Sequence, residues 1–186
     1  MKNVTRSIIL LFLCMGIATP MFSRTALNLY GKASLPFGEY TKYVSVNVGG
    51  GIGAELDPFF VPNLGTSLHA DFQAGILKDK RIKSIWDLSF YGGIWYRLNW
   101  GSFAFQPELN YGVCIHKVTM TPGWYGPEDI NLDQMLQFAP AFRWTPGSKL
   151  NSTAAIDIAP CYTLLFEKDN LLHQLGLRIG LTYALN

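Results

Sequence analysis

The chain has 186 residues, of which 49% are hydrophobic, 14% aromatic and only 15% charged, and it contains 18 glycines. This composition excludes an intrinsically disordered protein, which needs low hydrophobicity and high charge. It also excludes a multi-pass helical membrane protein, because no apolar run of about 20 residues follows residue 24. A chain that is apolar, aromatic and rich in glycine, without long apolar runs, indicates a β protein.

The first 23 residues are typical of a secretory signal peptide. Lys2 and Arg6 form a basic start, and an apolar stretch follows over residues 8–17. We expect cleavage after Ser23, which divides the chain into a signal peptide (1–23) and one domain (24–186). Cys14 follows Leu13 rather than a small residue, which favours an ordinary signal-peptide cysteine over a lipidated one.

The charge of the mature domain argues against nucleic-acid binding. Residues 1–23 hold two of the 15 Lys and Arg and none of the 13 Asp and Glu, so basic and acidic residues balance after cleavage. Nucleic-acid binding needs a basic excess. The two remaining cysteines, Cys114 and Cys161, are too few for a disulfide scaffold.

From residue 27 onward, apolar residues recur at every second position, which is the period of a β-strand. We expect eight strands, over residues 27–35, 44–56, 68–76, 86–98, 103–115, 136–144, 154–166 and 175–185. No position in the apolar phase is charged, whereas the other phase combines Gly and Ala with sparse charges of both signs.

This alternation fits either a soluble β protein with an apolar core or a transmembrane barrel with an apolar outer wall. Exposed strands of a soluble protein would be rich in Lys, Glu, Thr and Ser, whereas the many Gly and Ala here suit a narrow interior. Aromatic residues near the segment ends, including Trp86, Trp95, Trp100 and Trp144, favour the membrane, because Trp prefers its interface. Bilayers accept β structure only as closed barrels. We therefore predict an all-β fold, an eight-stranded antiparallel up-and-down transmembrane barrel.

A signal peptide, eight amphipathic strands and a final alternation from Leu175 to Leu185 resemble the small bacterial outer-membrane barrels, such as the OmpA membrane domain, OmpX and OmpW-type proteins. The resemblance covers essentially the whole mature chain. It implies an outer-membrane location with both termini in the periplasm, and an outer side formed by residues near 37–42, 78–84, 117–133 and 167–171. Such proteins commonly end in an aromatic residue, whereas this chain ends in Asn186.

The polar phase of the strands would line the lumen. An eight-stranded barrel is just wide enough inside for side chains, so opposite charges there should pair. We predict a lumen network of Lys32, Glu55, His69, Asp71, Asp87, Arg97, Glu108, His116, Arg143, Asp157 and Arg178. We interpret this network as structural, with a gated or narrow polar path as the functional alternative.

The lumen offers little catalytic chemistry. His69 and Asp71 share a face, but two ligands indicate a metal site only weakly. Ser67 and His69 are consecutive on one face, about 7 Å apart, too far for a direct hydrogen bond, and no catalytic motif is present. We therefore predict no enzymatic activity, no metal and no cofactor. Cys114 and Cys161 lie two strands apart, beyond the reach of a disulfide.

Two outer loops carry candidate contacts. Lys78, Lys80, Arg81 and Lys83 could bind phosphates of anionic lipid headgroups, although a solvated hairpin tip is the simpler interpretation. Trp124 and Tyr125 could contact lipid or a host molecule, or pack within an ordered loop.

Three prolines occupy the apolar phase of three successive strands: Pro107, Pro140 and Pro160. Each proline lacks the N–H of a ladder hydrogen bond. We expect either a bulge or a local gap in the wall.

The predicted function is that of a non-enzymatic outer-membrane barrel. It would have an envelope or surface role, or provide a narrow passage for small molecules, including hydrophobic ones as the OmpW-type resemblance implies. Its partners would be outer-membrane lipids, with small hydrophobic solutes or host surface molecules as further candidates. The alternatives are a secreted soluble eight-stranded ligand carrier and a lipid A-modifying enzyme.

Overall fold

The computed structural model describes residues 22–58, 61–122, 129–146, 154–167 and 171–185. They form antiparallel strands and one short 3-10 helix, η2: β1 (Phe22–Phe37), η2 (Gly38–Lys42), β2 (Val44–Pro58), β3 (Leu64–Leu77), β4 (Ile82–Tyr96), β5 (Leu98–Trp100), β6 (Phe103–Met120), β7 (Asp129–Trp144), β8 (Ala154–Phe166) and β9 (Leu171–Leu185). Among these residues, no helix is long and apolar enough to cross a membrane.

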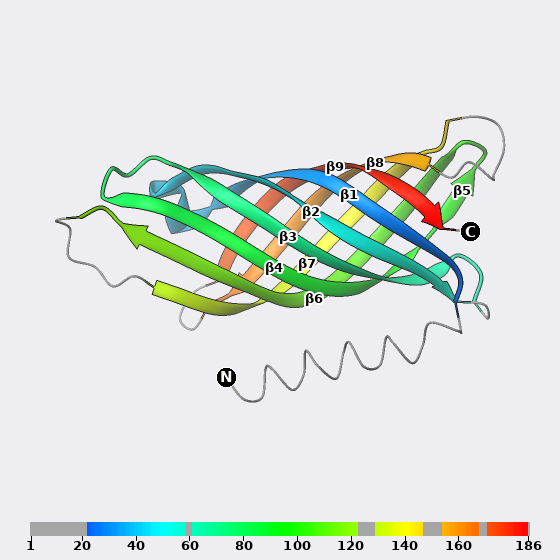
Figure 1. The fold of residues 1–186 in the computed structure, drawn as a ribbon, viewed down its shortest axis with the longest axis horizontal. Helices are drawn as coiled ribbons and strands as arrows, with labels where there is room; N and C mark the ends of the chain where they lie inside the picture. The colour runs from blue at the N-terminus through cyan, green and yellow to red at the C-terminus, as the bar shows by residue number, and fades with distance from the viewer. Residues whose placement is uncertain (1–21, 59–60, 123–128, 147–153, 168–170, 186) are drawn as a thin grey trace.

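The strands pair in sequence around a closed ring. The order is β4-β3-β2-β1-β9-β8-β7-β6, and the pairing of β4 with β6 closes the sheet. β5 continues β4 along β6 in the same register, so β4 and β5 together count as one of the eight strands of the barrel. The structure confirms the predicted eight-stranded antiparallel barrel, which Figure 1 shows from the side.

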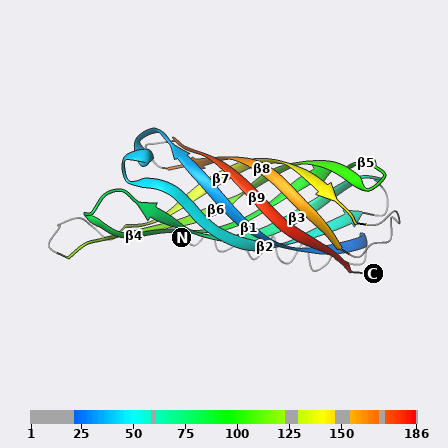
Figure 2. The same cartoon turned by 90° about the horizontal axis from the view of Figure 1, so that it is seen from above.

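The barrel has two distinct ends. β1 begins and β9 ends at one of them, called the terminal end below (Figures 1 and 2). The opposite end, which we call the loop end, carries η2 and the turn between β3 and β4. β6 reaches Met120 and β7 begins at Asp129, so the connection between them is shorter than the predicted stretch of 117–133.

Of the predicted signal peptide, residues 1–21 lie outside the described part. β1 begins at Phe22, so the strand includes the last two residues of that segment.

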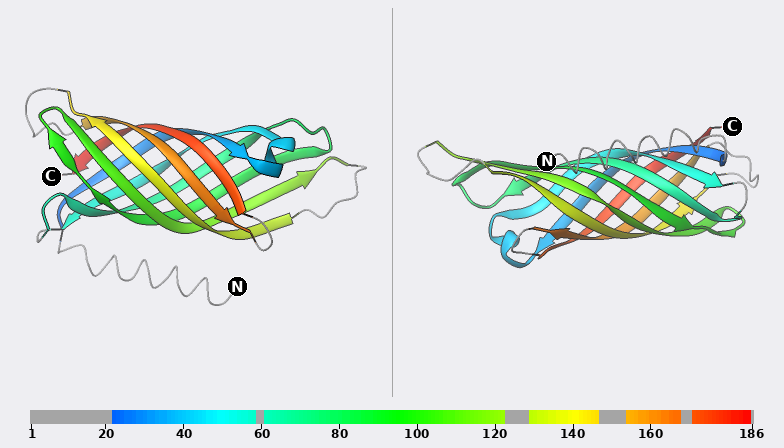
Figure 3. Two further views of the ribbon diagram at one scale, coloured as in Figure 1. Left: turned by 180° about the vertical axis from the view of Figure 1, so that it is seen from behind. Right: turned by 90° about the horizontal axis from the view of Figure 1, so that it is seen from below.

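The apolar phase of the strands faces outward. Leu29 is 65% exposed and Ile52 is 61% exposed, whereas Lys32 and Asp71 are buried inside the barrel. The same alternation runs through the wall formed by β7, β8 and β9, which lie side by side in the left panel of Figure 3. The lumen is therefore lined by the polar phase, as the composition of the two phases predicted.

Two apolar residues depart from the prediction. Val44 was expected to point outward, but a register shift between Val44 and Val46 turns its side chain inward, where it is fully buried. Trp95 was assigned to the membrane interface, but it is 2% exposed. Its indole N–H donates to the Thr66 carbonyl, and the Arg97 guanidinium lies 4.4 Å from its ring. Its place in the inward phase outweighs the interfacial preference of its side chain.

Candidate functional site

The predicted polar residues all point into the lumen and form three clusters. Most of them are buried, and the side chains of Arg97 and Asp157 are 17% and 14% exposed. The clusters follow one another from the terminal end to the loop end.

Glu55 is the centre of the cluster nearest the terminal end. It accepts two hydrogen bonds from Arg143, at 2.7 and 3.0 Å, and one from Arg97 at 2.8 Å. Arg143 also donates to Asp157, at 2.7 and 2.8 Å. Asn28 and Gln106 donate to the remaining positions on Glu55. This arrangement satisfies the buried charges, because each has both an opposite charge and hydrogen bonds.

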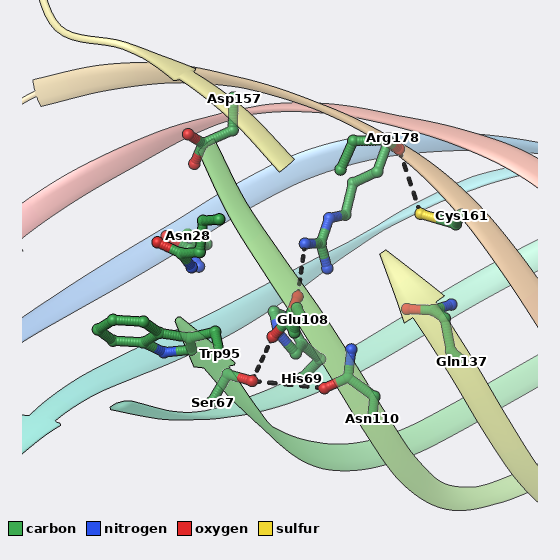
Figure 4. Close-up of polar contacts among 12 residues, drawn as sticks. Asn28, Ser67, His69, Trp95, Glu108, Asn110, Gln137, Asp157, Cys161 and Arg178 are labelled. Carbon is green, nitrogen blue, oxygen red and sulfur yellow. Dashed lines mark hydrogen bonds and ion pairs between the residues drawn. The ribbon is translucent and has the colours of Figure 1, made fainter. Parts of the chain in front are cut away.

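Glu108 is the centre of the middle cluster, shown in Figure 4. Its carboxylate lies 2.9 Å from His69 Nε2 and 2.9 Å from Arg178 Nη2, and it accepts a hydrogen bond from the Ser67 hydroxyl. His69 therefore contacts Glu108 rather than joining Asp71 in a metal site. Within the described residues, no group of three or more His, Cys, Asp or Glu side chains is placed to hold a metal ion.

A second group of hydrogen-bonded side chains in the middle of the lumen is centred on the Asp71 carboxylate, which is the acceptor. Lys32 donates to it at 2.7 Å, Tyr91 donates at 2.9 Å, and the Tyr30 hydroxyl is a third donor. Both tyrosines also contact the ring of His69. Tyr30 and Tyr91 were not predicted to belong to the network, although both lie in the inward phase of their strands, which could have identified them.

The third cluster, at the loop end, combines an ion pair with an apolar plug. His116 Nδ1 lies 2.5 Å from Asp87. Above this pair, Tyr40 of η2 packs with the buried side chains of Val44, Ile82 and Ile85. The ring of Tyr40 meets that of His116 edge-on at 5.6 Å. These apolar side chains thus fill the lumen next to the ion pair, and η2, which contributes Tyr40, was not predicted from the periodicity.

The two cysteines among the described residues, Cys114 and Cys161, are free and buried on the lumen side of the barrel. Cys114 lies on β6 and Cys161 on β8. β7 separates these strands.

The three prolines interrupt two ladders of the barrel. Phe138 pairs with Tyr162 and pairing resumes at Phe142 with Ile158, so the register places Pro140 opposite Pro160 across the unpaired stretch. The register is the same on both sides, so the prediction of a bulge was wrong and that of a local gap agrees with this ladder. Two opposed prolines supply no donor to a shared rung, which removes both of its hydrogen bonds.

Pro107 accounts for the second interruption. The register of β6 places it opposite Tyr96, next to Arg97, where the strand breaks between β4 and β5. On the other side, the backbone N–H of Arg97 donates to the Asn63 carbonyl at 2.7 Å, which continues the register of β3 with β4.

The lumen side of the β7–β8 gap is lined by small residues. Ala139, Ala141, Ala159 and Cys161 form one buried cluster, each at most 3% exposed. Pro160 lies on the exposed outer face. We call this stretch, residues 139–141 and 159–161, the proline seam.

The basic loop is an ordered turn at the loop end. Lys78, Lys80, Arg81 and Lys83 are exposed, and Arg81 pairs with Asp79 at 2.5 Å. The side chain and the backbone N–H of Arg81 both donate to the Asp79 carboxylate. These hydrogen bonds hold the pKa of Asp79 below its ordinary value. Trp124 and Tyr125, the other predicted loop contacts, lie outside the described residues.

Comparison with known proteins shows the fold class. The sequence matches no protein-family model and no curated protein. The structure is similar to Neisserial surface protein A, with a TM-score of 0.61 and 10% identity over 86% of this chain and 96% of that chain. It is similar to Ail of Yersinia pestis, with a TM-score of 0.58 and 14% identity over 89% and 100%. It is also similar to the outer membrane protein OprG of Pseudomonas aeruginosa, with a TM-score of 0.51 and 16% identity over 89% and 97%.

These structural neighbours are small outer-membrane barrels, so the fold of this chain is the one that the resemblance implied. At such low identity, the likeness concerns the fold alone.

Proposed function

We propose that this protein is a non-enzymatic outer-membrane barrel with a lumen closed to polar solutes, acting through its outer wall and its loop end. The ion pair between Glu55 and Arg143 carries the proposal. Their strands, β2 and β7, are four places apart in a ring of eight, so the pair joins opposite walls of the barrel. A side-chain contact across the full lumen obstructs a polar path at that depth, and Arg97 and Asp157 bond to the same pair from other strands.

The outer wall supports insertion into a bilayer. Large apolar side chains are exposed on the outer face of each of the eight strands, including Leu29, Phe72, Tyr111 and Leu181. A closed ladder with an apolar outer face is the form of β structure that a bilayer accepts. We propose the orientation implied by the resemblance, with the terminal end in the periplasm.

The same geometry argues against a soluble ligand carrier. Such a carrier would place its apolar phase inside and its polar phase in water, whereas here buried Glu55, Asp71 and Glu108 line the interior. Folding in detergent followed by removal of the detergent tests this point. The proposal predicts that the folded chain precipitates without detergent or lipid and shifts on unboiled gels. A soluble, folded, monomeric chain without detergent would support the carrier instead.

The lumen also argues against a lipid A-modifying enzyme. Ser67, the candidate nucleophile, is 2% exposed and donates its hydroxyl hydrogen to Glu108 rather than to a histidine. A nucleophile needs an adjacent base and access to substrate. Release of acyl chains from lipid A by the folded protein would overturn this part of the proposal.

The proline seam favours a second candidate function, the lateral passage of small hydrophobic molecules. A stretch of wall without ladder hydrogen bonds, lined inside by alanines and a cysteine, is the least secured part of the β7–β8 contact. Opening there would break no strand pairing, and it would connect the bilayer to the lumen above the Glu55–Arg143 pair. Labelling of the Cys161 thiol by a membrane-soluble reagent tests this candidate.

The loop end is the candidate region for host contacts. Ail has been crystallised with the heparin analogue sucrose octasulfate. We propose that any host molecule meets this chain at the loop end, where η2 and the basic loop lie.

A further inference from the structure

A group of lysines lies on the outer rim of the barrel, at the loop ends of β3, β4 and β6. Lys117 belongs to the outward phase of β6, because its neighbour His116 points into the lumen. Lys83 is the extra residue at a register shift in β4: Ile82 pairs with Met120, and Ser84 pairs with Thr119. A bulged residue is re-aimed relative to the ladder, and Lys83 is exposed.

The position of a tryptophan, Trp86, indicates the depth of these lysines in the membrane. Trp86 is the direct register partner of Lys117 in the β4–β6 ladder. On the outer wall its ring packs 6.2 Å from the ring of Phe72. Trp side chains at barrel ends lie at the level of the lipid headgroups. Lys117 therefore lies at headgroup depth, and Lys83 and the basic loop lie just above it.

The backbone holds the loop above this site in place. Lys78 N–H donates to the Tyr43 carbonyl at 2.8 Å, and Thr121 N–H donates to the Arg81 carbonyl at 2.8 Å. The Thr121 hydroxyl donates to the Lys80 carbonyl at 3.0 Å. The turn is thus fixed on one side to Tyr43, which follows η2, and on the other to Thr121, which follows β6. A fixed turn loses little conformational entropy when its side chains bind a ligand.

The local charge is positive. Asp79 lies in the same turn, and its carboxylate is engaged by Arg81. Within the described part of the chain, no carboxylate forms an ion pair with Lys80, Lys83 or Lys117.

We propose that Lys80, Lys83 and Lys117 bind the phosphate groups of a phosphorylated glycolipid of the surrounding leaflet. This inference rests on the proposed membrane insertion. A lipid is favoured over a soluble polyanion because Lys117 faces outward beside Trp86, at a depth that a lipid phosphate occupies and that a soluble molecule does not reach. A polybasic site at this level attracts anionic headgroups by about 1 kcal/mol per lysine, which corresponds to about fivefold in affinity.

Lipid retention tests the proposal. The mature chain, folded in zwitterionic detergent, is incubated with diphosphoryl lipid A or with the same lipid after dephosphorylation, and bound lipid is measured after purification. We expect the diphosphoryl form to be retained in large excess. The variant K80Q/K83Q/K117Q should lose on the order of 100-fold in affinity, and K80R/K83R/K117R, which keeps the charges, should bind like the wild type. A gel shift on boiling checks the folding of each variant.

Three results would overturn the inference. They are equal retention of the two lipid A forms by the wild type, unchanged retention by the glutamine variant, and displacement of lipid A by inositol hexakisphosphate as effectively as by lipid A itself. The comparison of the two lipid forms uses only the wild type, so it decides the matter even if a variant fails to fold. Failure of the wild type to enter zwitterionic bilayers would instead contradict the proposed function.

Discussion

Glu55 and Arg143 join opposite walls of the barrel through two hydrogen bonds, at 2.7 and 3.0 Å. Each partner is also held from the strand next to its own: Glu55 accepts from Asn28 of β1, and Arg143 donates to Asp157 of β8. The pair therefore acts both as a cross-brace for the fold and as an obstruction in the lumen. Its two roles can be tested separately, by stability and by solute flux.

The first prediction concerns the stability of the brace. Glu55→Gln keeps the shape of the side chain but leaves the guanidinium groups of Arg143 and Arg97 without this carboxylate. Removing one partner of a buried ion pair costs about 3–5 kcal/mol, so the free energy of unfolding should fall by about that amount in urea titrations followed by tryptophan fluorescence. Asp79→Asn, at the exposed Asp79–Arg81 pair, is the control and should lower the unfolding midpoint far less, because exposed ion pairs contribute little to stability. Equal effects of the two substitutions would contradict this account.

The second prediction concerns the acid titration of the basic loop. The Arg81 hydrogen bonds hold the pKa of Asp79 below its ordinary value of 3.8. The stabilisation from this pair is present above pH 3.8 and is lost as the pH falls through the lower pKa of the folded state. An NMR titration of the Asp79 carboxyl carbon should give a midpoint below 3.8, and Arg81→Gln should raise it. An unchanged midpoint in the variant would show that Arg81 does not hold the carboxylate.

The third prediction compares the two free thiols. Cys161 belongs to the proline seam, whereas Cys114 lies on β6, whose ladders with β4 and β7 are continuous at that position. In liposomes, a membrane-soluble thiol reagent should therefore label Cys161 faster than Cys114, measured by mass spectrometry of the digested protein.

Restoring the donors of the seam is the matched test of this idea. Pro140→Val together with Pro160→Val supplies two N–H groups to the ladder, which should slow the labelling of Cys161. Each new hydrogen bond should also raise the free energy of unfolding by about 0.5–1.5 kcal/mol. Equal labelling of the two cysteines in the wild type would remove the support for lateral passage.

The fourth prediction concerns the close approach of β2 to β3. A Cβ atom on Gly49 would lie 1.8 Å from the Phe72 carbonyl oxygen, so Gly49→Ala requires the backbone to shift. Overpacking of this kind typically costs about 1–3 kcal/mol. Gly31→Ala on β1 is the control, because its Cβ would meet only the Gly49 carbonyl oxygen, at 3.9 Å. Urea unfolding of both variants should separate them, and similar midpoints would contradict the close contact.

The sequence predicted the walls of the barrel well because the strand period is a local property. An uncharged apolar phase identifies the outward face, and it placed Lys32, Asp71 and Glu108 inside without knowledge of any contact. The alternation could not predict which of the lumen residues form ion pairs with one another. Glu55 and Arg143 are 88 residues apart, and their meeting depends on how far the strands tilt and stagger around the ring.

The alternation also could not predict local irregularities of the strands, such as register shifts and interrupted ladders. The register shifts at Val44 and Lys83 turn one side chain inward and re-aim another, yet neither has a signal in the alternation. The prolines could be recognised as missing donors, but only the register shows that Pro140 and Pro160 share a rung while Pro107 interrupts a different ladder. Trp95 shows that phase outweighs residue type when the two conflict.

The central claim, a lumen closed by the Glu55–Arg143 brace, is tested most directly by solute flux. The mature chain is folded into liposomes loaded with a small polar dye, and leakage is compared with that from empty liposomes and from liposomes holding a double variant, Glu55→Ala with Arg143→Ala, whose folding is checked by its gel shift on boiling. The account predicts no leakage through the wild type and measurable leakage through the double variant. Rapid leakage through the folded wild type would contradict it and would show that the protein is a small pore.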